Sequence, residues 1–252
     1  MKIYPKLNIF LNVLPVKPNG MHPIFSRFVL AHGNLYDEME VLFGEAEQFI
    51  IEGDFDFPLE QNLIFKAKEA LKSVFVNLSD ELEHIKVCVQ KKIPQGSGLG
   101  GGSANAGAFL IKVGQRFGIA KQELMSVAKN LGSDVSFFVS EYESANVSGF
   151  GEIVEEFVEA NHYEYEIYTP PFACETSRVY QSFDALENSP VFKFDFCNLS
   201  SIELLHRYAL EELNDLFLPA CRLYPKLLEL KRDLGEGWFF SGSGSSFFRI
   251  KR

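Results

Sequence analysis

The chain has 252 residues, of which 46% are apolar, 14% aromatic and 23% charged, and its formal net charge is −10. This is the composition of a globular protein, long enough for one large domain or two moderate ones. The acidic balance gives no basic field to attract a nucleic acid or an anionic membrane, so we expect neither as a partner. An anionic substrate would have to be held by local lysines and backbone amides.

The N-terminal half of the chain alternates between strand and helix patterns. Alternating or compact apolar runs predict strands at 7–16, 25–30, 38–44 and 47–53, with a turn at 19–22. Apolar residues at steps of three and four then predict a helix over 62–75. Residues 84–93 alternate again, as in a strand buried on one face in an antiparallel or mixed sheet. A glycine-rich segment follows, then a helix to about 117 and another over 121–131, closed by Gly132.

The amino-acid composition becomes acidic and aromatic after Gly151. We therefore place a domain boundary there, between residues 1–152 and 153–252. The sequence of residues 153–252 predicts helices over 201–213 and 225–235, followed by a strand, a loop and a strand over 238–250. Strands and helices together indicate an α+β fold.

The cysteines and histidines give no sign of a metal site or a disulfide framework, because no CxxC pair and no HExxH motif occurs. A reducing compartment is therefore the default. The apolar start of the chain is interrupted by Lys6, Asn8, Asn12 and Pro15, and no small-residue cleavage site follows, so we expect no signal peptide. No apolar run approaches the length of a membrane span. We expect a cytoplasmic protein.

The segment "KKIPQGSGLGGGSANAG" has five glycines in the seven positions 96–102 and leads directly into a helix. It formally matches GxGxxG, but a dinucleotide-binding unit needs a strand with an acidic residue after the helix, and here another helix is predicted. A Walker A loop is excluded because no Lys-Ser or Lys-Thr follows the last glycine. A linker or plain turn would need only one or two glycines. Bare backbone ahead of a helix that Ser103 can N-cap instead suits a phosphate chain.

Three other features are ambiguous by themselves. Asp134, after a helix stop, is most simply the N-cap of a short helix. Gly242 and Gly244, between two aromatic strands, read as a loop. Lys6, alone among apolar residues in a strand, could be an edge lysine whose amine reaches solvent.

Taken together, these motifs resemble the galactokinase, homoserine kinase, mevalonate kinase and phosphomevalonate kinase (GHMP) superfamily. The resemblance rests on the loop at 94–104 and the late glycine motif at 241–246. It is carried further by the segments "PKLNIFL", "NGMH", "QNLI", "LGSDVSFF", "SGFGE" and Asn214-Asp215, which follow in order from residue 5 to 248. It therefore covers nearly the whole chain, and the N-terminal pieces are similar to a member that acts on an alcohol carrying a cytidine diphosphate group.

The resemblance implies a two-domain architecture, with an ATP-binding N-terminal domain of the ribosomal protein S5 domain 2 type and a ferredoxin-like C-terminal domain. It implies that ATP phosphorylates a small-molecule alcohol, with Mg²⁺, in isoprenoid precursor synthesis, by a monomer or homodimer. Asp134 would accept or orient the hydroxyl proton, and Lys6 would keep Asp134 ionised and offset phosphoryl charge.

The resemblance also implies binding residues. Those expected at ATP are Asn62, Pro94, Gln95, Gly96, Ser97, Gly98, Leu99, Gly100, Gly101, Gly102, Ser103 and Ala104, with Ser103 also at the metal. Those expected at the cytidyl substrate are Asn8, Met21, His22, Thr176, Tyr180, Gly242, Ser243 and Gly244, His22 contacting the cytosine and Tyr180 stacking on it. Met21 departs from the superfamily member's pattern, because an aromatic residue usually stands there. Ala104 and Ser136 replace a frequent serine and a frequent proline.

Two other interpretations remain open on the sequence. The chain could be a GHMP kinase for a different alcohol, such as homoserine or a mevalonate derivative, which His22 and Tyr180 argue against. It could also be a nucleotide-binding fold without catalysis, which Lys6 and Asp134 argue against.

Overall fold

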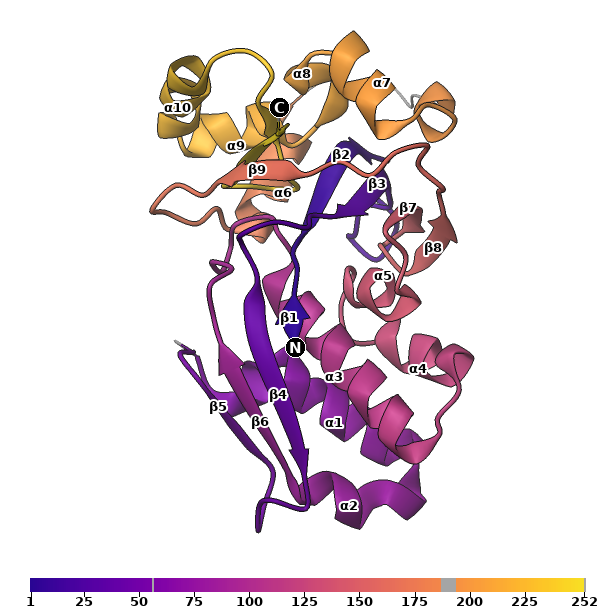
Figure 1. The fold of residues 1–252 in the computed structure, drawn as a ribbon. Helices are drawn as coiled ribbons and strands as arrows, with labels where there is room; N and C mark the ends of the chain where they lie inside the picture. The colour runs from indigo at the N-terminus through magenta and orange to yellow at the C-terminus, as the bar shows by residue number, and fades with distance from the viewer. Residues whose placement is uncertain (56, 187–193, 252) are drawn as a thin grey trace.

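The computed structural model describes residues 1–55, 57–186 and 194–251. Within these residues the strands form three sheets, one in the lower half of the view in Figure 1 and two side by side in its upper half. No helix among them is long and apolar enough to cross a membrane.

The first sheet is mixed and has the order β1-β4-β6-β5, with β5 parallel to β6 and the other neighbours antiparallel. Helices pack on one side of it (Figure 1). Along β6 the side chains of Ile85, Val87 and Val89 are buried against these helices, while Gln90 is exposed, which confirms the predicted alternation. The strands are β1 (Lys2–Ile3), β4 (Asp37–Phe43), β5 (Ile50–Gly53) and β6 (Ile85–Gln90), and the helices are η1 (Leu59–Gln61), α1 (Leu63–Val74), η2 (Val76–Leu78), α2 (Ser79–Glu83), α3 (Gly101–Phe117) and α4 (Lys121–Ala128).

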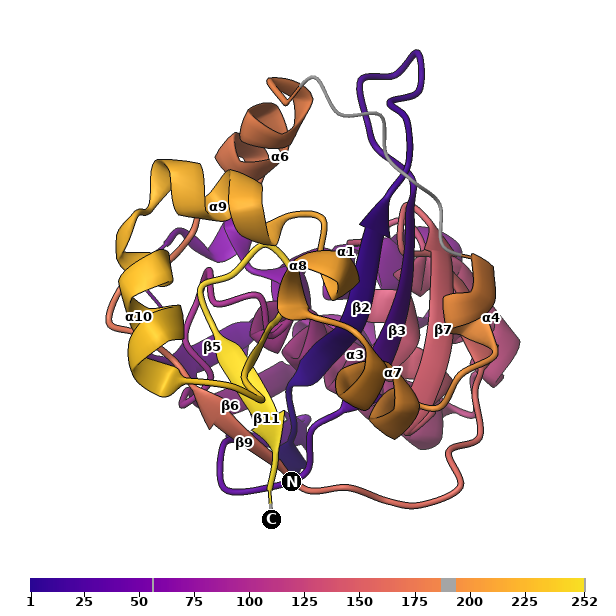
Figure 2. The same ribbon diagram turned by 90° about the horizontal axis from the view of Figure 1, so that it is seen from above.

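The second sheet is antiparallel, with the order β2-β3-β7-β8, and it lies beside the third sheet (Figure 2). All eight residues of β2 are buried, so the apolar start of the chain is a buried strand, although it is the end strand of this sheet. Its last strand pairs with β7 as far as Glu156, so the sheet extends four residues past the predicted boundary at 152. The elements are β2 (Lys6–Val13), β3 (Ile24–Leu30), α5 (Val135–Ser140), β7 (Ser144–Gly149) and β8 (Ile153–Glu156).

The third sheet, with the order β10-β11-β9, belongs to the C-terminal part, and its helices surround it (Figure 2). The strands are β9 (Tyr165–Tyr168), β10 (Phe239–Phe240) and β11 (Phe247–Ile250), and the helices are α6 (Thr176–Asp184), η3 (Phe194–Cys197), α7 (Ser201–Arg207), α8 (Leu210–Leu213), α9 (Phe217–Leu223) and α10 (Lys226–Leu234). The predicted strand–loop–strand at the end of the chain is thus confirmed.

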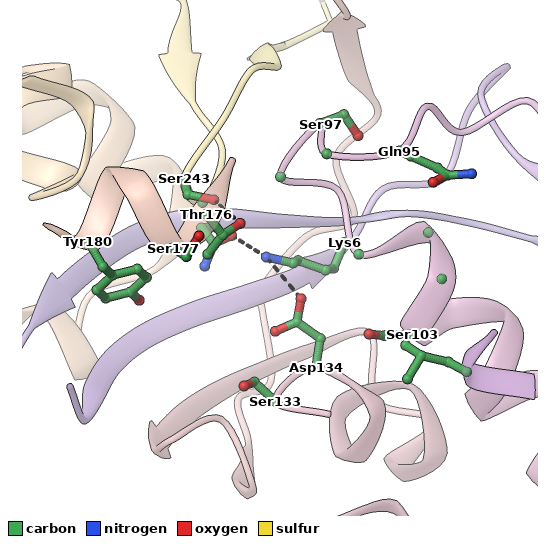
Figure 3. Close-up of a pocket in the computed structure, with 18 of the residues that line it drawn as sticks. Lys6, Gln95, Ser97, Ser103, Ser133, Asp134, Thr176, Ser177, Tyr180 and Ser243 are labelled. Carbon is green, nitrogen blue, oxygen red and sulfur yellow. Dashed lines mark hydrogen bonds and ion pairs between the residues drawn. The ribbon is translucent and has the colours of Figure 1, made fainter. Parts of the chain in front are cut away.

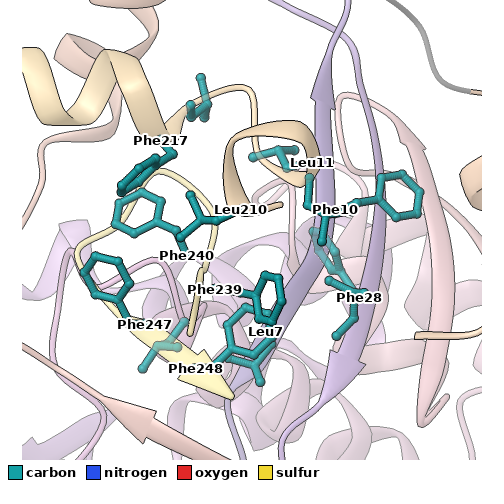
Figure 4. Close-up of a cluster of buried hydrophobic side chains, with 14 of the residues drawn as sticks. Leu7, Phe10, Leu11, Phe28, Leu210, Phe217, Phe239, Phe240, Phe247 and Phe248 are labelled. Carbon is teal, nitrogen blue, oxygen red and sulfur yellow. The ribbon is translucent and has the colours of Figure 1, made fainter. Parts of the chain in front are cut away.

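One hydrophobic cluster joins the second and third sheets. Leu7, Phe10 and Phe28 of the second sheet pack in the same cluster as Phe217 and Phe248 of the C-terminal part (Figure 4). A separate cluster fills the space between the first sheet and its helices. The division into domains 1–152 and 153–252 stays a prediction, and the apolar core is continuous across that boundary.

Two helix predictions need correction. The helix predicted over 201–213 is two helices, because Tyr208 and Ala209 are extended and the Ala209 amide donates to Glu212 Oε2 (2.9 Å), which starts a new helix. The helix that was predicted to reach residue 131 ends at Ala128, and the next three residues form turns. The helix predicted over 62–75 is confirmed within one residue at each end, with Asn62 as its N-cap: the Asn62 side chain accepts from the Ile64 amide (2.9 Å).

Candidate active site

The phosphate loop, residues 96–102, folds through backbone conformations that favour glycine. Gly96, Gly98 and Gly100 have φ angles of 61°, 76° and 69°. At Gly98 a side chain is also excluded by contact, since a Cβ atom there would lie 2.1 Å from the carbonyl oxygen of Ser241. Glycine is therefore required at this position both for its conformation and for the close approach of the serine loop, residues 241–246.

The carbonyl groups of the phosphate loop are occupied by donors from distant parts of the chain. The pairs are Cys174 N to Gly96 O (3.0 Å), Ser246 N to Ser97 O (3.0 Å), Ser241 Oγ to Gly98 O (3.1 Å) and Lys6 N to Leu99 O (3.0 Å). In a trans peptide the N–H points opposite to the C=O, so the amides that follow these carbonyls point away from their partners. Residues 95 and 96 form a turn, and within the described residues no acceptor outside the loop takes a hydrogen bond from the amides of residues 98 to 103. They form an open set of donors for an anion.

Helix α3 adds its own amides to this set. It begins at Gly101, and Gly100, in the left-handed conformation, is its N-cap. The prediction that Ser103 is the N-cap is wrong: the chain turns at Gly100, whose carbonyl accepts the first helical bond from the Ala104 amide (2.8 Å). Ser103 lies in the first turn instead. No side chain caps the helix, so its N-terminal amides and positive dipole end face the pocket without a partner.

Lys6 and Asp134 meet beside this loop, as the resemblance implied. Their side chains form an ion pair, with Nζ 3.4 Å from Oδ2 (Figure 3). The pair lies against the loop backbone, because a Cβ atom on Gly100 would be 3.1 Å from Lys6 Cγ and 3.3 Å from Asp134 Oδ2. Asp134 stands at the N-cap position of α5, yet its side chain makes no capping bond. The simplest interpretation of Asp134 from the sequence, a helix cap, is therefore wrong.

Lys6 is held from several sides and is almost fully buried. Its amine donates to Asn8 Oδ1 (2.5 Å) and lies over the Phe28 ring, 4.5 Å from the centroid. Burial lowers the pKa of Lys6 below the ordinary lysine value, and Asp134 opposes this shift. The amide of Asn8 is oriented in turn, since its Nδ2 donates to Ser26 Oγ (2.9 Å). The lysine is thus fixed in place, and its amine does not reach solvent.

A cavity of about 940 Å³ opens in front of the loop and the ion pair, a size suited to a nucleotide and a second substrate. Most of the expected site residues line it. They are Lys6, Asn8, Met21, His22, Asn62, Pro94, Gln95, Gly96, Ser97, Gly98, Gly100, Gly101, Gly102, Ser103, Asp134, Thr176, Tyr180, Gly242 and Ser243.

Three expected residues do not line the cavity. The side chains of Leu99 and Ala104 are buried in the two hydrophobic clusters, and Gly244 packs against the Phe240 ring. The sequence also missed residues that do line it, among them Lys91 and Asp184. Lys91 directly follows β6 and pairs with the buried Asp37; the basic end of the alternating segment 84–93 was the signal in the sequence that could have found it. Asp184 ends α6, a helix that the sequence did not predict.

The residues expected at a cytosine gather at one end of the cavity. The His22 and Tyr180 rings stack, with centroids 5.7 Å apart and an interplanar angle of 29°. The loop before β3, which carries His22, and helix α6, which carries Tyr180, project on the same side of the molecule (Figure 2). Met21 is 49% exposed at the rim. Nearer the ion pair, Thr176 Oγ1 and Ser243 Oγ are 2.8 Å apart and share a hydrogen bond.

Comparison with known proteins agrees with this arrangement. Residues 62–142 match the model of the GHMP kinases N terminal domain. The chain is 39% identical to a 4-diphosphocytidyl-2-C-methyl-D-erythritol kinase of Helicobacter pylori (strain J99), over 99% of this chain and 93% of that one. It is 41% identical to the protein of the same name from Sulfurovum sp. (strain NBC37-1), over 98% and 97%.

Solved structures show the same fold. A crystal structure of 4-(cytidine 5'-diphospho)-2C-methyl-D-erythritol kinase superposes with a TM-score of 0.74 at 25% identity, covering 100% of this chain and 90% of that one. The mevalonate kinase of Methanococcus jannaschii superposes with a TM-score of 0.59 at 11% identity, with the same coverage.

The amide-lined loop, the Lys6–Asp134 pair and this fold define a kinase of the GHMP class, and the expected α+β GHMP architecture is confirmed. Within that class, the chain belongs to the 4-diphosphocytidyl-2-C-methyl-D-erythritol kinase family.

Proposed function

We propose that the protein transfers the γ-phosphoryl group of ATP to the 2-hydroxyl of 4-diphosphocytidyl-2-C-methyl-D-erythritol, a step of non-mevalonate isoprenoid precursor synthesis. The names of its relatives supply the substrate. The observation that carries the proposal is the ion pair between Lys6 and Asp134 at the open amides of the phosphate loop. One region of the cavity can thus hold a phosphate chain while a carboxylate faces an incoming alcohol.

Phosphoryl transfer needs positioning and charge neutralisation more than covalent catalysis. The amides of the phosphate loop and of the first turn of α3 would bind the ATP phosphates. Asp134 would orient the attacking hydroxyl and accept its proton as the new P–O bond forms and the bond to ADP breaks. The Lys6 amine, held between Asn8 and Asp134, would offset charge on the transferring group.

The residues present fit a magnesium ion that arrives with ATP. Among the described residues no group of three or more His, Cys, Asp or Glu side chains could hold a metal. Mg²⁺ commonly uses substrate phosphates, water and one or two protein oxygens, so a large protein cage is not required. Ser103 and Asp134 offer a hydroxyl and a carboxylate on the same side of the cavity (Figure 3). When bound, the ion would neutralise phosphate charge.

The other parts of the proposal rest on the cavity and the cysteines. The cytidine diphosphate group would lie toward His22 and Tyr180, and Thr176, Gly242 and Ser243 would line the substrate side. In the described structure Cys88, Cys174, Cys197 and Cys221 form no disulfide, in keeping with a reducing cytoplasm as the compartment.

The decisive assay is ADP release with Mg-ATP and a panel of alcohols that includes the cytidyl substrate, homoserine and mevalonate. We expect turnover only with the cytidyl alcohol. Turnover of homoserine or mevalonate without the cytidyl alcohol would refute the substrate assignment.

Asp134→Ala tests the role of the carboxylate. We expect this variant to lose nearly all turnover, because no other carboxylate pairs with Lys6 in the described structure, while calorimetry shows ATP affinity within about tenfold of wild type. Turnover near wild type would remove Asp134 from the mechanism.

A further inference from the structure

Asp37 is an acidic residue that lies fully inside the protein, close to the phosphate loop. It is the first residue of β4, and its side chain is 0% exposed. A carboxylate accepts hydrogen bonds and donates none, so its burial is tolerated only where donors surround it. Four donors do so here, and they come from Lys91, Lys92, Ile93 and Asn105. None of these residues belongs to β4, so the strand alone does not account for an aspartate at this position.

The two carboxylate oxygens of Asp37 hold opposite ends of the phosphate loop. Oδ1 accepts from the backbone amides of Lys92 (2.7 Å) and Ile93 (2.9 Å), which lie shortly before the loop. Oδ2 accepts from the side-chain amide of Asn105 (3.0 Å), in helix α3 shortly after the loop, and from the Lys91 amine. The Lys91 amine also donates to Asn105 Oδ1 (3.1 Å). One buried carboxylate therefore ties the chain that enters the loop to the helix that leaves it.

The two ends of the loop are also in direct contact, because residue 101 has no side chain. A Cβ atom on Gly101, the first residue of α3, would lie 2.8 Å from Ile93 Cγ2 and 3.3 Å from the Lys91 amine nitrogen. The separation of the loop ends is thus set by this contact and by the bonds to Asp37. That separation limits the directions in which the amides between the ends can point.

We infer that Asp37 is a positioning residue, which holds the ends of the phosphate loop together and so keeps the loop amides directed at the ATP phosphates. The physical reason is preorganisation, since a loop already held in its binding conformation loses less entropy when an anion binds. In the described structure Asp37 does not line the cavity, so it acts through the loop. Its own negative charge repels phosphate, so any gain in ATP binding comes from the geometry that it holds.

The inference rests on the proposed function for ATP as the bound nucleotide, and binding without turnover tests it separately. The probes are ATP and adenosine, which share the nucleoside and differ in the phosphates, titrated by calorimetry into wild type and Asp37→Asn. The asparagine keeps one oxygen for the amides of Lys92 and Ile93 but loses the acceptor for Asn105. We expect ATP to bind about tenfold or more weaker, and adenosine to stay within about threefold of wild type.

Glu38→Gln is the matched control, because Glu38 follows Asp37 in β4 but lies outside the cavity. Its side chain is 44% exposed and pairs with the exposed Lys92 amine (2.8 Å). The variant removes the same charge from the same strand, and neither affinity should change by more than about twofold.

Asn105→Ala breaks the same tie from the side of α3 and leaves the pair of Asp37 and Lys91 in place. It should therefore weaken ATP selectively as well, and in the double variant with Asp37→Asn the two losses should not add. If Asp37→Asn melts more than about 5 °C below wild type, Asn105→Ala is judged in its place by the same ratio of affinities.

The inference is overturned if Asp37→Asn keeps the wild-type ratio of the two affinities, if it weakens ATP and adenosine equally, or if the losses in the double variant add. Selective loss of ATP binding in a protein that does not turn over the cytidyl alcohol would refute the proposed function and leave the inference standing. Turnover of the cytidyl alcohol with an unchanged ratio in the variant would do the reverse.

Discussion

At the scale of single residues, the site depends on polar side chains that the fold has removed from water. Lys6 and Asn8 lie on one buried strand, and each is oriented by a specific partner: Asp134 for the lysine and Ser26 for the amide. A buried polar group without such partners would destabilise the fold. The same bonds that satisfy these groups therefore fix the geometry that phosphoryl transfer requires.

The protonation of Lys6 makes a testable prediction about pH. Burial lowers the pKa of Lys6 below the ordinary lysine value of 10.5, so its positive charge is present at low pH and is lost as the pH rises through the lowered pKa. We expect the alkaline limb of kcat/KM, which reports the free enzyme, to fall below pH 10.5. Lys92→Ala, at an exposed lysine paired with Glu38, should leave this limb in place. A limb at or above 10.5 would contradict the assignment.

At the scale of elements, the phosphate loop is shaped by the serine loop from the far end of the chain. Ser241 illustrates this, because its hydroxyl accepts from the Asn8 amide (3.3 Å) and donates to Gly98 O (3.1 Å). Asn214 holds the serine loop in turn, donating to the carbonyls of Phe240 and Gly242 (3.0 Å each). The amides of the phosphate loop face the cavity because these supports occupy its carbonyls.

Two glycine substitutions distinguish the effect of the contact between Gly98 and Ser241 from the effect of backbone strain alone. Gly98→Ala places a methyl group against the Ser241 carbonyl, so we expect the loops to separate and ATP affinity to fall tenfold or more. Gly118→Ala is the matched control: its φ is also positive, at 70°, but no atom lies within 4 Å of the added Cβ. It should cost about 1 kcal/mol of stability and leave ATP binding unchanged. Calorimetry and urea unfolding measure both effects, and equal ATP affinities would refute the proposed contact.

At the scale of the whole molecule, Arg27 of β3 joins the second sheet to the C-terminal part. Its guanidinium is fully buried, lies over the Phe157 ring (3.3 Å), and donates to Asn146 Oδ1 (2.8 Å) and to the carbonyl of Cys197 (2.9 Å). Glu159 pairs with it at 3.4 Å. Burial lowers the pKa of Arg27 to about 10, so it stays charged near neutral pH.

Removing this cation should destabilise the fold strongly. Arg27→Met leaves Glu159, itself only 11% exposed, without its cation, and we expect a loss of about 3–5 kcal/mol in the free energy of unfolding. Arg249→Met is the control, because its pair with Glu166 is exposed on both sides, and its loss should be at most about 1 kcal/mol. Urea denaturation compares them, and similar losses would show that Arg27 is not a structural brace.

The sequence by itself determined the features that depend on neighbouring residues. The alternation of Ile85, Val87 and Val89 predicted a strand with one buried face, and Asn62 ahead of apolar residues at helical spacing predicted a helix start. Five glycines before a helix predicted a bare-backbone anion loop. Each of these patterns depends on local geometry, which repeats every two residues in a strand and every three to four in a helix.

Only the tertiary structure decided what depends on contacts between distant segments. The resemblance to a family implied that Lys6 meets Asp134, but no spacing in the chain shows that Cys174, Ser241 and Ser246 turn the loop carbonyls away from the cavity. Asp184 was missed for the same reason, since only the packing of α6 beside the loop before β3 brings it to His22. The physical reason is that long-range approach is set by how whole hydrophobic faces pack together, and the local order of residues does not record it.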